Sequence, residues 1–347
     1  MSMKAKILEL LREKKDRVAA GAPESEAYVS GQELCEQFGV SRTAVWKAIG
    51  QLKKEGYVIE AVQNRGYRLL DETEEVYNQA DIQSRLKTKW VAHPLQFFDS
   101  IDSTNIRAKL EAEQGAESGL LVVSDMQSAG RGRRGRGWES PAGTNIYYTL
   151  MLKPHFSSDC APMLTLVMAL AVAKGIRQTL RCDSEEAAAK VGIKWPNDIV
   201  VDGKKVCGIL TEMSMEQGYI QHIVIGVGIN VRKQEFPEEI RDRAAAIDEQ
   251  CGFRISRSQL IADIMEAFEE DYEIFLRTHD LKGLRASYAE LLVNQDREVC
   301  VLDPKGEYRG IARGINDQGE LLVERQDGTV EEVYAGEVSV RGIYGYV

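Results

Sequence analysis

The sequence predicts a multidomain α+β protein: a winged helix-turn-helix head, a central mixed α+β domain with a largely antiparallel sheet, and a small C-terminal β-barrel. Three observations predict this class. A chain of 347 residues is long for one domain. The beginning of the chain reads as helices followed by two short strands, and its end reads as short strands separated by glycines. We expect the head at 1–70, a linker at 71–82, the central domain at 83–293 and the C-terminal domain at 294–347.

The composition excludes several classes of protein. Hydrophobic residues make up 44% of the chain and charged residues 28%, which excludes a wholly disordered or collagen-like protein. The net charge is -10, but it is distributed unevenly: residues 1–70 hold 12 Lys or Arg against 9 Asp or Glu. A positively charged head on an acidic body favours nucleic-acid binding at the head alone.

Location is also predicted from the sequence. No apolar run approaches the ~20 residues of a membrane span, and the charged N-terminus lacks the apolar stretch of a signal peptide. The six cysteines are scattered without a C-x-x-C pair, which argues against a structural zinc site. We expect reduced thiols, a cytoplasmic location and no membrane partner. The ligands of any metal are unknown at this point.

The head is predicted from its caps and turns. Ser30 and Glu33 form a capping box that opens a second helix, which ends before a tight turn at Gly39. Ser41 then caps a third helix. The expected elements are a first helix with Ile7, Leu8, Leu10 and Leu11 on its apolar face, helices from Ser30 to Phe38 and from Ser41 to Glu55, and strands at 57–62 and 67–70.

The outer face of the third helix is predicted to bind DNA. A helix fits the major groove, where Arg and Lys meet phosphates and base edges, and a wing tip contacts the backbone beside it. An alternative is that these charges are merely solvated on a small helical module. The candidate DNA-binding residues are Ser41, Arg42, Thr43, Trp46, Lys47 and Arg65.

The central and C-terminal parts read as strands and a few long helices. Asp202-Gly203 is a hairpin turn, and successive hairpins favour an antiparallel sheet over a βαβ array. The tail favours a five-stranded barrel. The expected central strands are 120–124, 146–152, 191–195, 199–201, 205–213 and 219–227, with helices at 163–180 and 256–282.

Residues 130–135 read Gly-Arg-Gly-Arg-Arg-Gly, which matches the dinucleotide-binding pattern G-x-G-x-x-G. A dinucleotide loop runs directly into a helix, whereas this one continues through Gly137 and Pro141 and cannot do so. Its four arginines suit a loop that surrounds a polyanion and becomes ordered when that ligand binds. A basic loop that contacts DNA or RNA is the alternative.

Three further motifs end strands or begin helices. Lys194-Trp195-Pro196-Asn197-Asp198 offers a cation for a carboxylate or phosphate, or is a turn with a surface lysine. Gly226-Val227-Gly228-Ile229-Asn230 lets a ligand approach the backbone, or is a β-bulge. Ser103-Thr104-Asn105 lies where a strand gives way to a helix and is either a binding motif or an ordinary cap.

Together these motifs, in this order and approximate spacing, resemble those of biotin–protein ligases, and the head resembles that of the bifunctional type that also represses the biotin operon. The resemblance covers essentially the whole chain. It implies a central ligase domain and an SH3-like C-terminal barrel. It further implies a two-step reaction, in which biotin and MgATP give biotinyl-5′-adenylate, which then acylates one lysine of a biotin carboxyl carrier protein.

The resemblance also implies roles for individual residues. The implied catalytic residues are Arg131, Arg133 and Lys194. The implied biotin-binding residues are Ser103, Thr104, Asn105, Gln127, Arg131, Gly132, Arg133, Lys194 and Gly208, with 205–209 forming part of the pocket wall. The implied nucleotide-binding residues are Trp138, Arg136 and Asn230, and the charged stretch 231–248 follows where an adenylate-covering loop is expected.

The implied cofactors and substrates are ATP, Mg²⁺ and biotin. The implied partners are the biotin carboxyl carrier protein, operator DNA and a second copy of the chain, with homodimerisation on ligand binding. Three alternatives stay open: a transcription factor that only senses a small molecule, a relative acting on lipoate or octanoate, and a ligase whose head no longer binds DNA.

Overall fold

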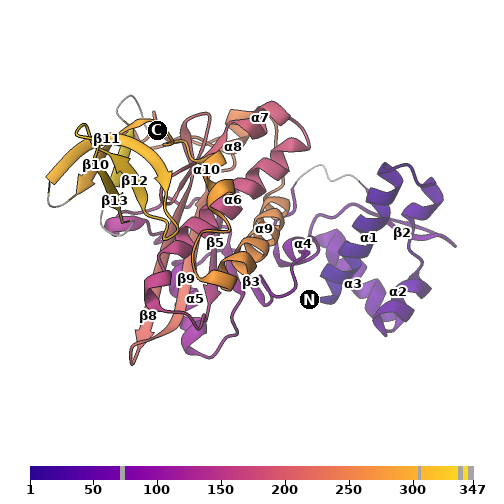
Figure 1. Ribbon diagram of the computed structural model, residues 1–347. Helices are drawn as coiled ribbons and strands as arrows, with labels where there is room; N and C mark the ends of the chain where they lie inside the picture. Colours follow the sequence, from indigo (N-terminus) through magenta and orange to yellow (C-terminus); the bar gives the residue numbers. More distant parts are fainter. Residues whose placement is uncertain (71–74, 304–305, 335–338, 343–347) are drawn as a thin grey trace. The chain divides into compact units, whose positions relative to one another are not determined.

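The computed structural model describes the chain from residue 1 to 342 except 71–74, 304–305 and 335–338, and residues 343–347 also lie outside it. Two compact units make up the chain, Met1–Leu86 and Lys87–Val347 (Figure 1). The predicted linker at 71–82 falls partly on residues outside the description, and its last residues belong to the first unit.

The first unit confirms the helix-turn-helix and wing. The Ser30 hydroxyl accepts a hydrogen bond from the Glu33 N–H, the Ser41 hydroxyl caps the third helix, and Gly39 has a left-handed φ of 64°. The apolar face of the first helix packs into one core with the other two. The elements are α1 (Met3–Ala19), the 3-10 helix η1 (Glu24–Ala27), α2 (Gly31–Phe38), α3 (Arg42–Lys54), β1 (Ile59–Val62) and β2 (Gly66–Leu69).

A short helix, α4 (Gln79–Gln83), completes this unit. Its Asp81 is 1% exposed and accepts hydrogen bonds from Arg12 of α1, from Tyr57 at 3.2 Å and from Arg85 at 3.2 Å. A buried carboxylate requires such partners. The helix is therefore fastened to α1 as part of the head.

The second unit is built on a seven-stranded sheet in the order β3-β4-β5-β9-β8-β7-β6. All neighbouring strands are antiparallel except β3 and β4, so the largely antiparallel sheet is confirmed. Asp202 and Gly203 both have positive φ and form the predicted hairpin turn. The strands are β3 (Leu95–Phe98), β4 (Leu120–Ser124), β5 (Ile146–Leu152), β6 (Val191–Lys194), β7 (Asp198–Val201), β8 (Lys204–Glu216) and β9 (Tyr219–Ile229).

Helices cover both faces of this sheet. Helix α5 contacts β4, β5 and β9 on one face, whereas α6 packs against β6 to β9 and against α9, which lies beside it in Figure 1. The helices are α5 (Thr104–Glu113), α6 (Met163–Arg181), α7 (Glu185–Ala189), α8 (Ile247–Cys251), α9 (Arg257–Thr278) and α10 (Arg285–Leu291), with 3-10 helices η2 (Arg133–Gly135) and η3 (Ser158–Cys160).

The core helix α6 corrects one expectation. In the part of the chain that the structure describes, the segment Ser158–Arg181 is long and apolar enough to cross a membrane by length and composition. However, 72% of its most apolar window is buried inside the unit. The apolar run exists because α6 is the central core helix against the sheet.

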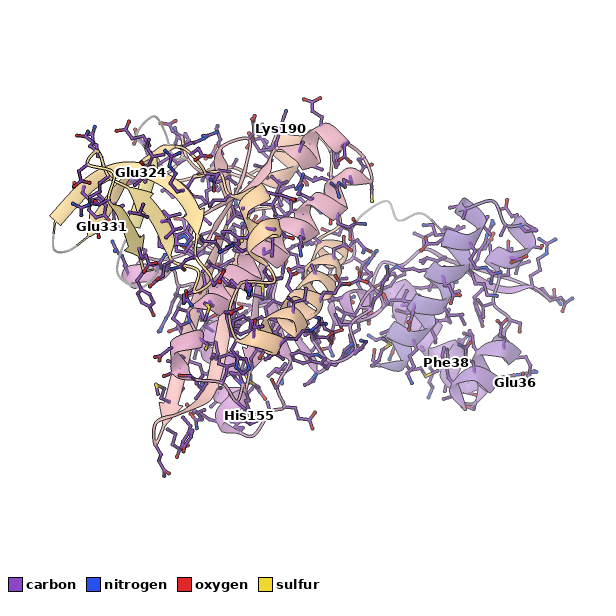
Figure 2. The ribbon with its side chains drawn as sticks, in the orientation of Figure 1. Glu36, Phe38, His155, Lys190, Glu324 and Glu331 are labelled. Carbon is purple, nitrogen blue, oxygen red and sulfur yellow. The ribbon has the colours of Figure 1, made fainter. Side chains whose placement is uncertain are left out.

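The chain ends in a five-stranded antiparallel sheet in the order β13-β12-β11-β10-β14, as the five predicted strands require. Glu324 and Glu331 lie on its neighbouring strands β12 and β13 (Figure 2). This sheet is anchored to the central one through Trp195, whose indole N–H donates to Gly319 O at 2.9 Å. The strands are β10 (Glu298–Asp303), β11 (Gly306–Ile315), β12 (Leu321–Glu324), β13 (Val330–Val333) and β14 (Ser339–Gly342).

Candidate active site

The floor of the site is one row of residues across the sheet. Strand register aligns Lys194 with Asp198, Asp198 with Gly208, and Gly208 with Gly228. Residues in one such row share a face of the sheet. Gly226, two residues before Gly228, lies on this face as well, so three glycines leave the middle of the floor without side chains.

A cavity of about 830 Å³ lies over this floor. It brings together segments that are far apart in the sequence. These are the start of α5, the arginine-rich loop at 130–138 (the arginine loop), the turn after β6, and the segment after β9. The predicted residues that line it are Ser103, Thr104, Asn105, Gln127, Arg131, Gly132, Arg133, Arg136, Trp138, Gly208 and Asn230. Lys194 is not among the lining residues; it is buried at 5% exposure, beside Asp198 in the row.

One end of the cavity carries a network of amides and hydroxyls. The Gln127 Oε1 accepts hydrogen bonds from the Thr104 N–H at 2.9 Å and the Thr104 hydroxyl at 3.1 Å. Thr149, on β5, donates to Asn105 Oδ1 at 2.6 Å and lies 2.8 Å from the Thr104 hydroxyl. Ser103 is the N-cap residue of α5, as the cap alternative expects, but its side chain makes no capping hydrogen bond. These groups suit a neutral ligand rich in N–H and C=O groups.

Glu212 completes this network, and sequence reasoning missed it. It accepts from Asn105 Nδ2 at 2.8 Å and pairs with Lys109 Nζ at 2.7 Å. Burial acts to raise the pKa of this carboxyl, but the hydrogen bonds from Lys109 and Asn105 outweigh it and hold the pKa below its ordinary value. Alternation along β8 from Gly208 would have placed Glu212 on the floor face, since the two are four residues apart.

As predicted, the arginine loop does not run into an α-helix. It closes on itself through a bridge between Arg131 and Gly137, with a single turn of 3-10 helix at 133–135. Arg133 reaches across the cavity and donates to Asn197 Oδ1 at 2.7 Å. Burial lowers the pKa of Arg133, although Asp198 acts in the opposite direction. The loop is therefore joined to the Lys194–Asp198 motif through one guanidinium.

Trp138 packs against two of the floor glycines, Gly208 and Gly228. A Cβ atom on Gly228 would come within 2.5 Å of its indole, and one on Gly208 within 2.9 Å. Only glycine leaves room for the ring at these positions. Asn230 is 6% exposed, and its backbone N–H donates to Val206 O at 2.8 Å, which fixes the end of β9 against β8.

The candidate DNA-binding residues lie together on the head. Ser41, Arg42, Thr43 and Lys47 are exposed along α3, and Trp46 is 69% exposed. The Arg42 guanidinium donates a hydrogen bond to Gln32 Oε1 of α2 at 2.9 Å. Arg65 at the wing tip lies 5.7 Å from the centre of the Tyr28 ring.

Comparisons with known proteins agree with this architecture. The Biotin/lipoate A/B protein ligase family matches residues 97–230, an HTH domain matches 24–68, and the Biotin protein ligase C terminal domain matches 296–341. The bifunctional ligase/repressor BirA of Bacillus spizizenii is 37% identical over 331 residues, covering 94% of this chain and 98% of the relative. That of Escherichia coli is 32% identical over 312 residues, covering 90% and 92%.

A solved structure also matches this chain. The biotin protein ligase from Aquifex aeolicus in complex with biotin and ATP superposes with a TM-score of 0.59 at 29% identity, covering 72% of this chain and 98% of that one. The chain belongs to the biotin protein ligase family. With its helix-turn-helix domain, it is of the bifunctional ligase/repressor type.

Proposed function

We propose that the protein joins biotin to ATP, forming biotinyl-5′-adenylate and pyrophosphate, and then transfers biotin to one lysine of a biotin carboxyl carrier protein. The observation that carries the proposal is the composition of the cavity over the floor. Neutral hydrogen-bonding groups line it together with the four arginines of the loop, Arg131, Arg133, Arg134 and Arg136. A neutral ring system with a carboxylate tail, lying next to a nucleotide, fits that composition.

We assign the residues accordingly. Ser103, Thr104, Asn105 and Gln127 bind the biotin rings, with Gly208 in the floor beneath. Trp138, Arg136 and Asn230 bind the nucleotide. Arg131, Gly132 and Arg133 lie at the junction of the two ligands, and Lys194 is buried in the row beneath it, beside Asp198.

The chemistry requires cations at this junction. The biotin carboxylate must approach the α-phosphate, and two such charges repel by roughly 1 kcal/mol at about 4 Å in water, and by more in a dry site. Arg131 and Arg133, with Lys194 from the row beneath, offset this repulsion and stabilise the charge that develops on phosphorus. The arginine loop excludes water from the reactive anhydride once it is formed.

ATP binds as its magnesium complex, and the carboxylates that line the cavity suit Mg²⁺. Mg²⁺ is commonly held by one or two carboxylates together with substrate phosphates. Among the described residues no group of three or more His, Cys, Asp or Glu could hold a metal alone, whereas Glu139, Asp198 and Glu235 separately line the cavity. When bound, Mg²⁺ would neutralise phosphate charge there.

We propose that the head binds operator DNA and thereby represses genes for biotin, which is the second activity. We propose that ligand binding favours a homodimer, which would present two heads to a palindromic site. The substrates and the chromosomal target are together in the cytoplasm, which we propose as the place of action.

Biotin-dependent exchange of pyrophosphate into ATP tests the enzyme directly. We expect exchange that requires biotin and does not occur with lipoate. Exchange with lipoate alone would assign the protein to a different substrate, and no exchange with either would leave only the sensing role.

A further inference from the structure

A buried asparagine outside the assigned set lies where β5 begins. Asn145 is fully buried and immediately precedes Ile146, the first residue of β5. Ile146 pairs with Ile229, the last residue of β9, so Asn145 lies beside the point where the chain leaves the sheet. A buried amide requires hydrogen-bond partners. The partners of the Asn145 side chain lie on the segment that follows β9.

The Asn145 side chain holds this segment at two residues. Its Oδ1 accepts a hydrogen bond from the Val231 N–H at 3.0 Å, and its Nδ2 donates to Gln234 Oε1 at 3.2 Å. The Gln234 Nε2 donates in return to Asn145 Oδ1 at 3.4 Å, so the two amides exchange hydrogen bonds. Gln234 lines the cavity, whereas Asn145 does not. Asn145 therefore acts on the cavity through Gln234.

Other elements of the unit fix Asn145 in turn. The Arg257 Nη1, on α9, donates to Asn145 O at 3.2 Å and to Asp125 Oδ1 at 2.8 Å. Asp125 directly follows β4, and its Oδ2 accepts from the Gly143 N–H at 2.9 Å. Arg257 is itself buried. The Asn145 amide is thus fastened to α9 and to the end of β4, and a group held in this way can position its partner.

The segment after β9 depends on this contact because it has little structure of its own. No helix or strand lies between the end of β9 at Ile229 and the start of α8 at Ile247. Residues 233–236, all of which the structure describes, make no backbone-to-backbone hydrogen bond. Three of them, Gln234, Glu235 and Phe236, line the cavity. Backbone without such bonds opens at little cost in free energy.

We infer that Asn145 is a positioning residue, which holds the segment 231–237 against the cavity through Val231 and Gln234, so that this wall of the nucleotide site is in place before the nucleotide binds. The inference rests on the proposed function, since it concerns the same nucleotide. It assigns a part in nucleotide binding to a residue that does not line the cavity.

Limited trypsin digestion of the full chain without ligands tests the positioning. Lys233 is exposed and lies within the held segment. Cleavage after it requires the segment to open, and its rate follows the population of the open form. Asn145→Ala removes the hydrogen bonds to Val231 and Gln234, so cleavage after Lys233 should become about tenfold faster or more. Mass spectrometry of the fragments identifies the site of cleavage.

Calorimetric titration tests the consequence for the nucleotide. The probe is the magnesium complex of α,β-methylene-ATP, which cannot release pyrophosphate, added in the presence of biotin. Asn145→Ala should weaken binding of this probe by about tenfold, because the segment must then be ordered during binding. Its affinity for biotin should stay within about twofold, since the groups assigned to the biotin rings belong to another network.

Gln234→Ala is the second variant, and it carries the test if Asn145→Ala does not fold. Gln234 is only partly buried, and its removal should give both effects. The double variant should add little to either single one, because the two amides act as a pair. The matched control is Asn78→Ala. It removes the acceptor of the Asp81 N–H, at 2.9 Å in the head, and should change neither cleavage after Lys233 nor either affinity.

The two proposals fail in different ways. If both variants were cleaved after Lys233 as slowly as wild type, or lost biotin and nucleotide affinity alike, Asn145 would be an ordinary structural residue and the inference wrong. Fully additive effects in the double variant would also contradict it. A wild-type protein that bound no probe and showed no exchange would instead overturn the proposed function.

Discussion

At the scale of single residues, Arg133 has the most consequential position. Its guanidinium joins the arginine loop to Asn197 in the turn after β6, and we propose that this loop encloses the intermediate. The residues that we propose for the biotin rings, Thr104, Asn105 and Gln127, belong to a different hydrogen-bond network. Retention of the intermediate and binding of the vitamin are therefore separable by substitution.

Arg133→Gly should loosen the adenylate more than it weakens biotin binding. We expect the dissociation rate of biotinyl-5′-adenylate to rise by roughly tenfold or more, with the biotin affinity changed much less, because a charged hydrogen bond is lost only at the phosphate end. Released intermediate should label bystander lysines, which a streptavidin blot detects. A variant that held its adenylate as tightly as wild type would remove Arg133 from this role.

Glu212 makes the stability of the fold depend on pH. Its folded-state pKa lies below the ordinary value of 4.5, so its ionised form stabilises the fold fully above that value. The stabilisation is lost as the pH falls through the lower folded-state pKa. Glu212→Gln should cost about 1 kcal/mol at neutral pH, given the partial exposure of the pair, and the cost should shrink well below pH 4.5.

Urea unfolding of both proteins at neutral and acidic pH measures this difference. A cost that grew in acid would mean that the neutral carboxyl is the stabilising form.

At the scale of elements, the bare floor of β8 and β9 determines what can lie above it. A Cβ on Gly226 would overlap Asn105 Oδ1. Gly226→Ala should displace Asn105 from Thr149 and Glu212 and lower the biotin affinity by about tenfold or more, measured by calorimetry. Gly50→Ala, in α3 with nothing within 4 Å, should leave biotin binding unchanged and stabilise its helix by up to about 1 kcal/mol.

The Trp195 anchor connects the central and C-terminal sheets. Trp195 is 2% exposed, and removing its indole N–H leaves Gly319 O without that donor. Trp195→Phe should lower the free energy of unfolding by roughly 2 kcal/mol through the lost hydrogen bond and volume. Trp46→Phe makes the same substitution at a 69% exposed position and should change it by less than about 0.5 kcal/mol. Urea unfolding that gave equal values would contradict the anchor.

Local patterns predicted most of these elements and much of the site. Ser30, Ser41 and Asp202-Gly203 act through neighbours in the chain, and the structure has them as expected. Glu212 was missed because its partner Asn105 lies 107 residues away, and no local pattern reports such a contact. Helix α4 was missed because five residues are too few to display a helical period. The β-bulge between β7 and β8, where Ile199 pairs with Cys207 but Val200 pairs with Lys205, could not be predicted for a similar reason, because register depends on two strands together.

At the scale of the whole molecule, we propose that one ligand serves both activities. We expect operator binding, measured by gel shift, to tighten when biotin and ATP are both present, because the adenylate would favour the dimer. Lys47→Ala should weaken binding under all conditions and reduce its salt dependence, as expected for a phosphate contact. Equal operator affinity with and without the ligands would show that the activities are not coupled here.

The contacts of Asp81 determine how long a fragment must be for the head to be studied without the second unit. A fragment that stopped after the wing would leave Arg12 without a carboxylate it contacts and expose the side of α1 that α4 covers. A fragment that continued through Leu86 would keep the contact between Arg12 and Asp81 and the packing of α4 on α1. Truncation at the shorter length would therefore yield an unstable peptide, and its failure to recognise an operator would say nothing about the intact repressor.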